Sequence, residues 1–243
     1  MVITRPSGES RGLVRSLRRL GMEPIRLPAL ALRPMPGLEP RALAKRIAAL
    51  HALIALSPAS VRFARALLPE PSLPKGLRLY AIGAASAAAL RRWSGRPVEH
   101  GLTPTSEGLL AAPALVAVQG LRIGLLGAPG GRMLLADTLK ARGAEVELLA
   151  VYRREPARWD RRHRQRLALL ERPWVLLSSE QALRALLDLA GPERARLLAG
   201  TAVVSSDRLA RLARGCGFAA VTLARGPAAA DFLEVLRPAS PPR

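Results

Sequence analysis

Residues 121–156, LRIGLLGAPGGRMLLADTLKARGAEVELLAVYRREP, decide the fold of this chain. The apolar run 123–126 predicts a buried strand, and a glycine-rich turn follows it over 127–132. Apolar residues then return at helical spacing until Gly143, a residue type suited to ending a helix. A second apolar run, 146–151, leads into Tyr152 and stops at Pro156. Strand, turn, helix and strand in this order form the repeating unit of a parallel α/β sheet.

The same pattern occurs a second time, 122 positions earlier in the chain. Gly21 aligns with Gly143, and the register still holds, without a gap, where Ser57 aligns with Ser179. Single matches are expected by chance in a chain rich in Ala, Leu and Arg, but an ungapped register over three successive units is not. The sequence therefore indicates an internal duplication into two halves of like build.

Short apolar runs and helical patterns alternate along the rest of both halves. The predicted strands cover 2–4, 24–32, 52–56, 77–82, 97–100, 123–126, 146–151, 174–177, 202–204 and 219–223. The predicted helices, with their caps, cover 12–20, 41–50, 57–68, 85–93, 105–116, 134–142, 160–171, 178–189, 205–214 and 228–236, and 238–243 forms a tail.

The formal net charge of +20 fits three kinds of partner: nucleic acid, an anionic membrane surface or an acidic small molecule. Arginine is spread along the whole chain, with one dense cluster at 161–166. Aromatic residues make up 3% of the chain, which leaves no stacking platform for single strands. We interpret most of the arginine excess as solvated surface, and place a polyanionic ligand ahead of nucleic acid for the remainder.

Cysteine content and hydropathy limit the class of protein. The single cysteine, Cys216, excludes an internal disulfide and a multi-cysteine zinc site. The start, MVITRPSGESRG, has no apolar signal-peptide core. No apolar run approaches the roughly 20 residues that span a bilayer. We therefore expect a cytoplasmic protein without a membrane partner.

Small and hydroxyl-bearing residues follow the predicted strands. In open parallel sheets, ligands bind beyond the carboxyl ends of the strands, where helix N-termini offer free N–H groups to carboxylates or phosphates. The expected binding residues are Arg5, Ser57, Ser86, Ser106, Gly130, Gly131, Arg132, Ser179, Ser205 and Ser206. Any one serine could instead be only a helix N-cap, but their recurrence in both halves suggests two binding faces around one cleft. The turn 127–132 is neither GxGxxG nor a P-loop, so no nucleotide is expected.

The histidines carry no chemistry that the sequence can support. His51, His100 and His163 have neither the spacing of metal ligands nor a Ser/His/Asp arrangement, so we expect them to be inert and predict no metal site.

Tyr152 stands where the chain leaves one predicted lobe, beside Arg153 and Arg154. Its partner in the repeat is Leu30, so the duplicated strand does not require an aromatic residue there. A phenol at this place can donate a proton to a leaving oxygen or orient a ligand. The alternative is a tyrosine that only packs at the end of a strand.

Taken in order, these segments resemble the uroporphyrinogen-III synthase family over nearly the whole chain. The resemblance rests on ITRP at 3–6, LIALSPASVR at 53–62, AIG at 81–83, TSEGL at 105–109, the stretch 121–153 ending in Val151-Tyr152-Arg153, and the strand, Ser206 and helix near the end. Where related sequences often have Thr after the third strand of each half, this one has Ser86 and, near the C-terminus, Ser206 or Asp207.

The resemblance implies an α/β fold of two flavodoxin-like parallel-sheet lobes, joined by a two-strand connection and with the active site in the cleft. The first lobe would combine 1–31 with 157–243, the second would cover 36–151, and 32–35 and 152–156 would cross between them. The repeat alone equally allows tandem lobes that divide near residue 122.

For function, the resemblance implies a cyclising hydro-lyase of tetrapyrrole and heme biosynthesis that uses no cofactor. It would close hydroxymethylbilane to uroporphyrinogen III, inverting ring D through a spiro intermediate. Tyr152 matches the family's candidate acid, and serine caps, backbone N–H groups and basic residues would hold the eight carboxylates of the substrate. We expect a monomer, with the preceding or following enzyme of the pathway as a candidate partner. The alternative is a non-catalytic two-lobe binding or regulatory module for an anionic small molecule, which needs no Tyr152 hydroxyl.

Overall fold

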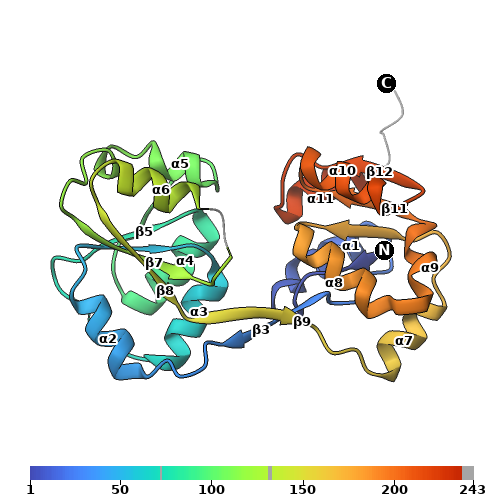
Figure 1. Ribbon diagram of the computed structural model, residues 1–243, viewed down its shortest axis with the longest axis horizontal. Helices are drawn as coiled ribbons and strands as arrows, with labels where there is room; N and C mark the ends of the chain where they lie inside the picture. The colour runs from blue at the N-terminus through green and yellow to red at the C-terminus, as the bar shows by residue number, and fades with distance from the viewer. Residues whose placement is uncertain (72, 131–132, 237–243) are drawn as a thin grey trace. The chain divides into compact units, whose positions relative to one another are not determined.

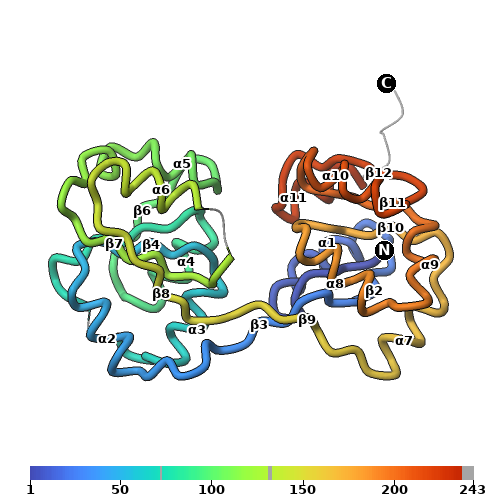
Figure 2. Tube along the Cα trace, in the orientation of Figure 1, coloured from blue at the N-terminus to red at the C-terminus, as the bar shows by residue number. Residues whose placement is uncertain are grey.

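The structure is a computed structural model that describes residues 1–71, 73–130 and 133–236 (Figure 1). The chain divides into two compact units: unit 1 is Met1–Leu32 with Arg154–Arg243, and unit 2 is Arg33–Arg153. The tube in Figure 2 shows the chain leaving unit 1 near its blue end and returning to it after the yellow-green segment. The two passages, β3 (Leu30–Pro34) and β9 (Tyr152–Pro156), pair as a two-stranded sheet.

Unit 1 holds a parallel sheet with the strand order β12-β11-β10-β1-β2. Its strands are β1 (Val2–Ile3), β2 (Ile25–Arg26), β10 (Trp174–Leu177), β11 (Thr201–Val204) and β12 (Ala220–Leu223). β1 pairs with β10 through Val2 and Val175, so segments from opposite ends of the chain build one sheet. Counted along the chain, the order is 2-1-3-4-5, which is the flavodoxin-like arrangement.

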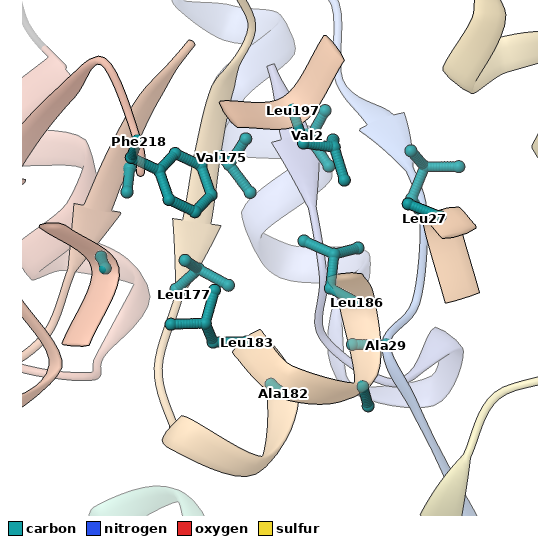
Figure 3. Packing of buried hydrophobic residues seen from close by; sticks show 14 of the residues in the cluster. Val2, Leu27, Ala29, Val175, Leu177, Ala182, Leu183, Leu186, Leu197 and Phe218 are labelled. Atoms are coloured by element: carbon teal, nitrogen blue, oxygen red, sulfur yellow. The ribbon is translucent and has the colours of Figure 1, made fainter. Parts of the chain in front are cut away.

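The period of two along each strand gives unit 1 two apolar layers. Val175 and Leu177 pack into one cluster with α8, while Leu176 between them packs into a second cluster with α1 and α11; Figure 3 shows the first cluster. The helices are α1 (Arg11–Arg19), α7 (Arg161–Ala168), α8 (Glu180–Ala190), α9 (Arg194–Leu198), α10 (Asp207–Gly215) and α11 (Ala229–Leu236), with 3-10 turns η1 (Ser7–Glu9) and η3 (Gly191–Glu193). Both faces of the sheet are therefore covered, as a parallel sheet requires.

Unit 2 holds a second parallel sheet with the order β6-β5-β4-β7-β8. Its strands are β4 (Ala52–Ala55), β5 (Arg78–Ala81), β6 (Glu99–His100), β7 (Arg122–Gly127) and β8 (Glu145–Ala150). Its helices are α2 (Pro40–Ala48), α3 (Pro58–Leu67), α4 (Ala84–Ser94), α5 (Ser106–Leu110) and α6 (Leu134–Ala141), with the 3-10 turn η2 (Pro113–Leu115). Ile54, Tyr80 and Ile123 form a core with α5 and α6, and α3 and α4 pack against strands of the same sheet.

The duplication seen in the sequence is present in the strands. β4 moved by 122 positions gives the bounds of β10, and β7 and β8 moved back by 122 positions overlap the shorter strands β1 and β2. Each unit therefore joins the front of one half to the back of the other. The predicted α/β fold of two parallel-sheet lobes is confirmed. Of the two arrangements that the repeat allows, the structure has the crossed one.

Two predicted elements differ from the structure, and one observed helix was not predicted. The strand expected over 24–32 is two strands, β2 and β3, in different sheets; Pro28, which has no N–H to donate to a ladder, lies between them. The helix expected to continue to 116 ends as α5 at Leu110, because Pro113 begins the separate turn η2. The short helix α9 was not predicted. The predicted tail 238–243 lies outside the described residues.

Within the described residues, no helix combines the length and the apolar character needed to cross a membrane.

Candidate active site

The turns that the sequence predicts to bind an anion lie at the carboxyl edge of the two sheets. In unit 2, Ser57 follows β4 and Gly130 lies in the turn after β7, and these two strands are neighbours. In unit 1, Ser179 follows β10 and Ser206 follows β11, which are also neighbours. Because all these pairs are parallel, each unit gathers its turns at one edge, where a doubly wound sheet binds ligands.

Ser57 is fixed in place by a reciprocal capping box at the start of α3. Its Oγ accepts a hydrogen bond from the Ser60 amide over 3.1 Å, and its own amide donates to Ser60 Oγ over 3.3 Å. Ser60 Oγ also donates to the Ser57 carbonyl over 2.7 Å, and Pro58 occupies the first helical position. The sequence Ser-Pro-Ala-Ser thus sets both the start of α3 and the orientation of the Ser57 hydroxyl.

Tyr152, 95 residues later in the chain, contacts Ser57 within unit 2. The Tyr152 Oη lies 3.4 Å from Ser57 Oγ, within hydrogen-bonding range. Its ring stacks on Phe63, with the ring centroids 5.2 Å apart and the planes inclined by 16°. Tyr152 is only 3% exposed. The phenol is therefore held at two places, by a hydroxyl at the N-terminus of α3 and by a ring nearly two turns farther along that helix.

Positive charge lies next to this aromatic pair. The Cζ of Arg62 is 5.3 Å from the centre of the Phe63 ring, a cation–π distance. Arg62 therefore places a guanidinium beside the cluster of Ser57, Phe63 and Tyr152, where it favours an anion.

The other predicted binding residues of unit 2 have different roles. Ser86 and Ser106 are buried, and neither is an N-cap: Gly83 takes that place for α4, and Thr105 for α5. The Thr105 Oγ1 accepts from the Gly108 amide over 3.0 Å. Gly130 is exposed and left-handed, with a φ of 75°, which suits glycine. Gly131 and Arg132 lie outside the described residues.

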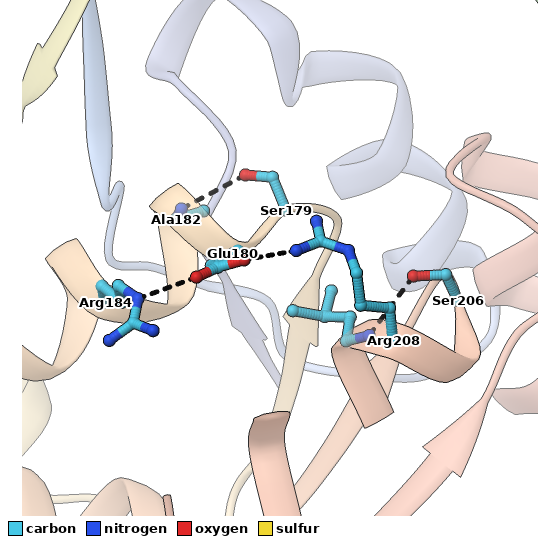
Figure 4. Close-up of polar contacts among 7 residues, drawn as sticks. Ser179, Glu180, Ala182, Arg184, Ser206 and Arg208 are labelled. Atoms are coloured by element: carbon cyan, nitrogen blue, oxygen red, sulfur yellow. Dashed lines mark hydrogen bonds and ion pairs between the residues drawn. The ribbon is translucent and has the colours of Figure 1, made fainter. Parts of the chain in front are cut away.

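Two of the three predicted serines of unit 1, Ser179 and Ser206, are helix N-caps. Ser179 Oγ accepts from Ala182 at the start of α8, and Ser206 Oγ accepts from Leu209 at the start of α10, over 3.2 and 3.4 Å (Figure 4). Ser205 Oγ donates to the Ser178 carbonyl over 3.4 Å and so joins the two turns. A cap occupies only some of the free N–H groups of a helix end, so the others stay open to an anion.

A cluster of one glutamate and two arginines also links α8 and α10. Glu180, in the first turn of α8, accepts from Arg184 Nε over 3.0 Å and from Arg208 of α10 (Figure 4). These two arginines lower the pKa of the Glu180 carboxyl below its usual value. The carboxylate is thus already paired, while both guanidiniums remain more than half exposed.

Arg5, after β1, already has partners inside unit 1. It donates to the carbonyl of Pro227, and its Cζ lies 5.6 Å from the centre of the Phe232 ring. Burial lowers the pKa of its guanidinium, while the nearby charges of Glu9 and Asp231 raise it. A guanidinium carries five N–H donors, so the bond to Pro227 leaves donors for a second acceptor.

The histidines take part in local structure. His51 Nδ1 accepts from the Arg122 amide over 2.8 Å, and His100 Nδ1 lies 2.8 Å from the Gly101 carbonyl. His163 forms a capping box with Asp160 at the start of α7, and this contact lowers the pKa of the Asp160 carboxyl. Among the described residues, no group of three or more His, Cys, Asp or Glu is placed to hold a metal ion. Cys216 packs, partly buried, against the core of unit 1.

The sequence as a whole matches one family. The family described as uroporphyrinogen-III synthase HemD matches residues 12–234. The chain belongs to the uroporphyrinogen-III synthase family. The resemblance inferred from the ordered segments is therefore confirmed.

Named relatives agree with this membership. The uroporphyrinogen-III synthase of Salmonella typhimurium is 36% identical over 244 residues, covering 92% of this chain and 94% of the relative. That of Escherichia coli K12 is 35% identical over 237 residues, with the same coverage of 92% and 94%.

Solved structures agree on the fold. A mutant uroporphyrinogen III synthase from Thermus thermophilus gives a TM-score of 0.60 at 20% identity, over 97% of this chain and 96% of the other. The uroporphyrinogen-III synthetase of Helicobacter pylori gives 0.61 at 16% identity, over 87% and 91%.

Phe63 is a residue of the candidate site that sequence reasoning did not find, as is its neighbour Arg62. It lies directly after the segment 53–62 that resembles the uroporphyrinogen-III synthase family, and it is one of three phenylalanines in the chain. Its position and the scarcity of phenylalanine are the sequence features that could have pointed to it. Its contact with Tyr152 spans most of unit 2 in sequence, and no periodicity within one helix could reveal it.

Proposed function

We propose that the protein is a uroporphyrinogen-III synthase, a cyclising hydro-lyase that closes hydroxymethylbilane to uroporphyrinogen III and inverts ring D through a spiro intermediate. The observation that carries the catalytic assignment is the position of the Tyr152 hydroxyl, 3.4 Å from the Ser57 hydroxyl at the N-terminus of α3. Membership of the family supports the reaction, and this geometry supports Tyr152 as the acid.

In the proposed first step, the lone pair of a pyrrole nitrogen expels the hydroxyl group from the hydroxymethyl carbon. The C–O bond breaks, the phenolic proton of Tyr152 joins the departing oxygen, and water leaves. Tyr152 is then a phenolate and the bilane carries an electrophilic carbon for the ring closure. The proton that the closing pyrrole carbon later loses restores the phenol, so the overall reaction releases one water.

The enzyme also has to hold the flexible bilane in a folded pose, which lowers the entropic part of the barrier. We propose that the substrate carboxylates bind at the carboxyl edges of the sheets. In unit 2 the groups are Ser57, Ser86, Ser106, Gly130, Gly131 and Arg132, and in unit 1 they are Arg5, Ser179, Ser205 and Ser206. Open N–H groups at the capped starts of α8 and α10 support this assignment.

Tyr152 is 3% exposed, so the substrate reaches its hydroxyl only after some of the covering side chains move. We therefore propose an opening step before chemistry and a closing step that excludes water from the electrophilic intermediate. Such steps are common in enzymes whose intermediates react with water.

The remaining properties follow from the reaction. We propose a monomer located in the cytoplasm, with no cofactor, that takes its substrate from the preceding enzyme of the pathway. The net charge of +20 supports an anionic small-molecule substrate.

The deciding experiment supplies hydroxymethylbilane to the purified protein and to Tyr152→Phe, and determines the isomer ratio of the uroporphyrinogen. Without a synthase the bilane closes to isomer I. We expect isomer III from the wild type and a turnover lower by on the order of 100-fold or more in the variant. Isomer III at equal rates from both would remove Tyr152 from the mechanism. Isomer I alone from the wild type would overturn the enzyme and leave a non-catalytic binding module.

A further inference from the structure

We propose that Ser57 is a positioning residue that stabilises the phenolate form of Tyr152, in addition to capping α3. This inference rests on the proposed function, because it assigns the partner of the acid in the same site. It is carried by the 3.4 Å approach of the two hydroxyl oxygens, by the capping box that fixes Ser57 and by the ring stack that fixes Tyr152.

The direction of the hydrogen bond changes during the reaction. While Tyr152 is protonated, either hydroxyl can donate to the other. Once the phenolic proton has left, the Tyr152 oxygen can only accept. Ser57 Oγ already accepts from the Ser60 amide and still carries its own hydrogen, so it is able to donate to the phenolate. The bond therefore becomes charge-assisted only after proton transfer, and it lowers the barrier more than it stabilises the resting state.

The surroundings favour this role of Ser57. The hydroxyl stands at the N-cap of α3, a helix of 10 residues whose N-terminus is the positive end of its dipole. The phenol is buried, so its hydrogen bond is not weakened by competing water. Phe63 keeps the ring in one plane, which holds Oη at Ser57 instead of letting it turn away.

Two variants separate capping from donation. Aspartate is a good N-cap but an ionised carboxylate cannot donate, whereas threonine both caps and donates. We expect Ser57→Asp to keep the stability of the wild type yet lower kcat on the order of 10- to 100-fold, the value of a hydrogen bond to a charged group. Ser57→Thr should recover most of the wild-type kcat. KM should change little in Ser57→Thr. It should rise in Ser57→Asp, because the added carboxylate repels the substrate carboxylates that Ser57 is proposed to help bind, so the hydrogen bond is read from kcat.

The same two substitutions are then repeated in the Tyr152→Phe background. There we expect no further loss of kcat, since the phenolate is absent. If Ser57→Asp keeps the wild-type kcat, or if it costs the same factor with and without the Tyr152 hydroxyl, the proposal is overturned. Urea unfolding measures the stability of each variant. If activity is lost only together with the folded state, Ser57 acts through capping alone.

A spectroscopic readout makes failure of this inference distinct from failure of the proposed function. The chain has two tyrosines, so labelling the Cζ of tyrosine with ¹³C gives two signals, and Tyr80 in the core of unit 2 is the internal control. We expect Ser57→Asp to move the Tyr152 signal and leave the Tyr80 signal in place. A moved signal in a protein that produces only isomer I would show the hydrogen bond without catalysis, which overturns both proposals. An unmoved signal in an active enzyme would overturn the role of Ser57 alone.

Discussion

Gly200 lies against the backbone of Pro173 so closely that a Cβ on Gly200 would overlap the Pro173 carbonyl oxygen. That oxygen also accepts the amide of Thr201, the first residue of β11, over 2.8 Å. The contact therefore joins the starts of β10 and β11, two adjacent strands in the sheet of unit 1.

Replacing Gly200 by alanine should destabilise unit 1. Backbone cannot yield as the end of a flexible side chain does, so we expect the free energy of unfolding to fall by about 2 kcal/mol or more. Urea unfolding measures it. The matched control is Gly215→Ala in α10, where a Cβ meets nothing within 4 Å and φ is not positive; it should be neutral or stabilising. Equal effects of the two changes would contradict the close contact.

The pair of Glu180 with Arg184 and Arg208 predicts a pH-dependent contribution to stability. The pKa of Glu180 is lower in the folded protein than its ordinary value, so the carboxylate stabilises the fold above the unfolded pKa. That contribution is lost as the pH falls through the lowered folded pKa. Glu180→Gln should therefore be less stable than the wild type at pH 7, and the difference should shrink in acid.

Urea unfolding of wild type and Glu180→Gln from pH 7 down to pH 3 checks this expectation. The Glu180 side chain is partly exposed, so added salt should also reduce the difference. Glu70→Gln, an exposed loop residue, is the control. A difference that grows in acid would reverse the sign and contradict the assignment.

Arg5 tests whether a residue with partners inside unit 1 also binds substrate. Arg5→Lys keeps the charge but loses the planar fork that donates to Pro227 and lies over Phe232. We expect a loss of stability of about 1–2 kcal/mol and a KM for hydroxymethylbilane raised about 3- to 10-fold, with kcat little changed. Arg225→Lys, at an exposed ion pair with Glu234, should change neither. An unchanged KM in Arg5→Lys would limit Arg5 to a structural role.

Unit 2 should fold without the rest of the chain. Residues 33–153 are contiguous, contain a complete five-stranded sheet and bury their own core. We expect this segment, expressed alone, to unfold cooperatively in urea. The control is 154–243, which lacks β1 and β2 and should not unfold cooperatively. A disordered 33–153 segment would contradict the independence of its core.

Much of this architecture was predictable because it depends on short-range chemistry. Ser57 before Pro58, Ser179 and Ser206 all mark helix starts, and the structure places an N-cap at each. The repeat identified β4 and β10 with matching bounds, since a duplicated sequence folds into duplicated strands. Family membership, and with it the reaction, followed from the order of such segments.

What escaped prediction depends on contacts between distant residues. Pro28 interrupts a hydrophobic pattern, yet only the partner strands show that β2 and β3 on either side of it belong to different sheets. Phe63 is one more apolar residue in α3 until Tyr152 lies on it. Ser86 and Ser106 fit a cap by composition, but Gly83 and Thr105 take those places. Local sequence patterns thus indicate candidate residues, whereas the contacts that each one makes depend on tertiary packing.

The exchange of halves between the two units also sets an order of events during synthesis. Unit 2 is complete when residue 153 has left the ribosome, and it is able to fold at once. β1 and β2, made first, must wait for β10, β11 and β12, made last. Until then, the buried faces of Val2 and Ile3 have no sheet to join and are exposed to chaperones and to other nascent chains. The strands that are synthesised first therefore join their sheet last.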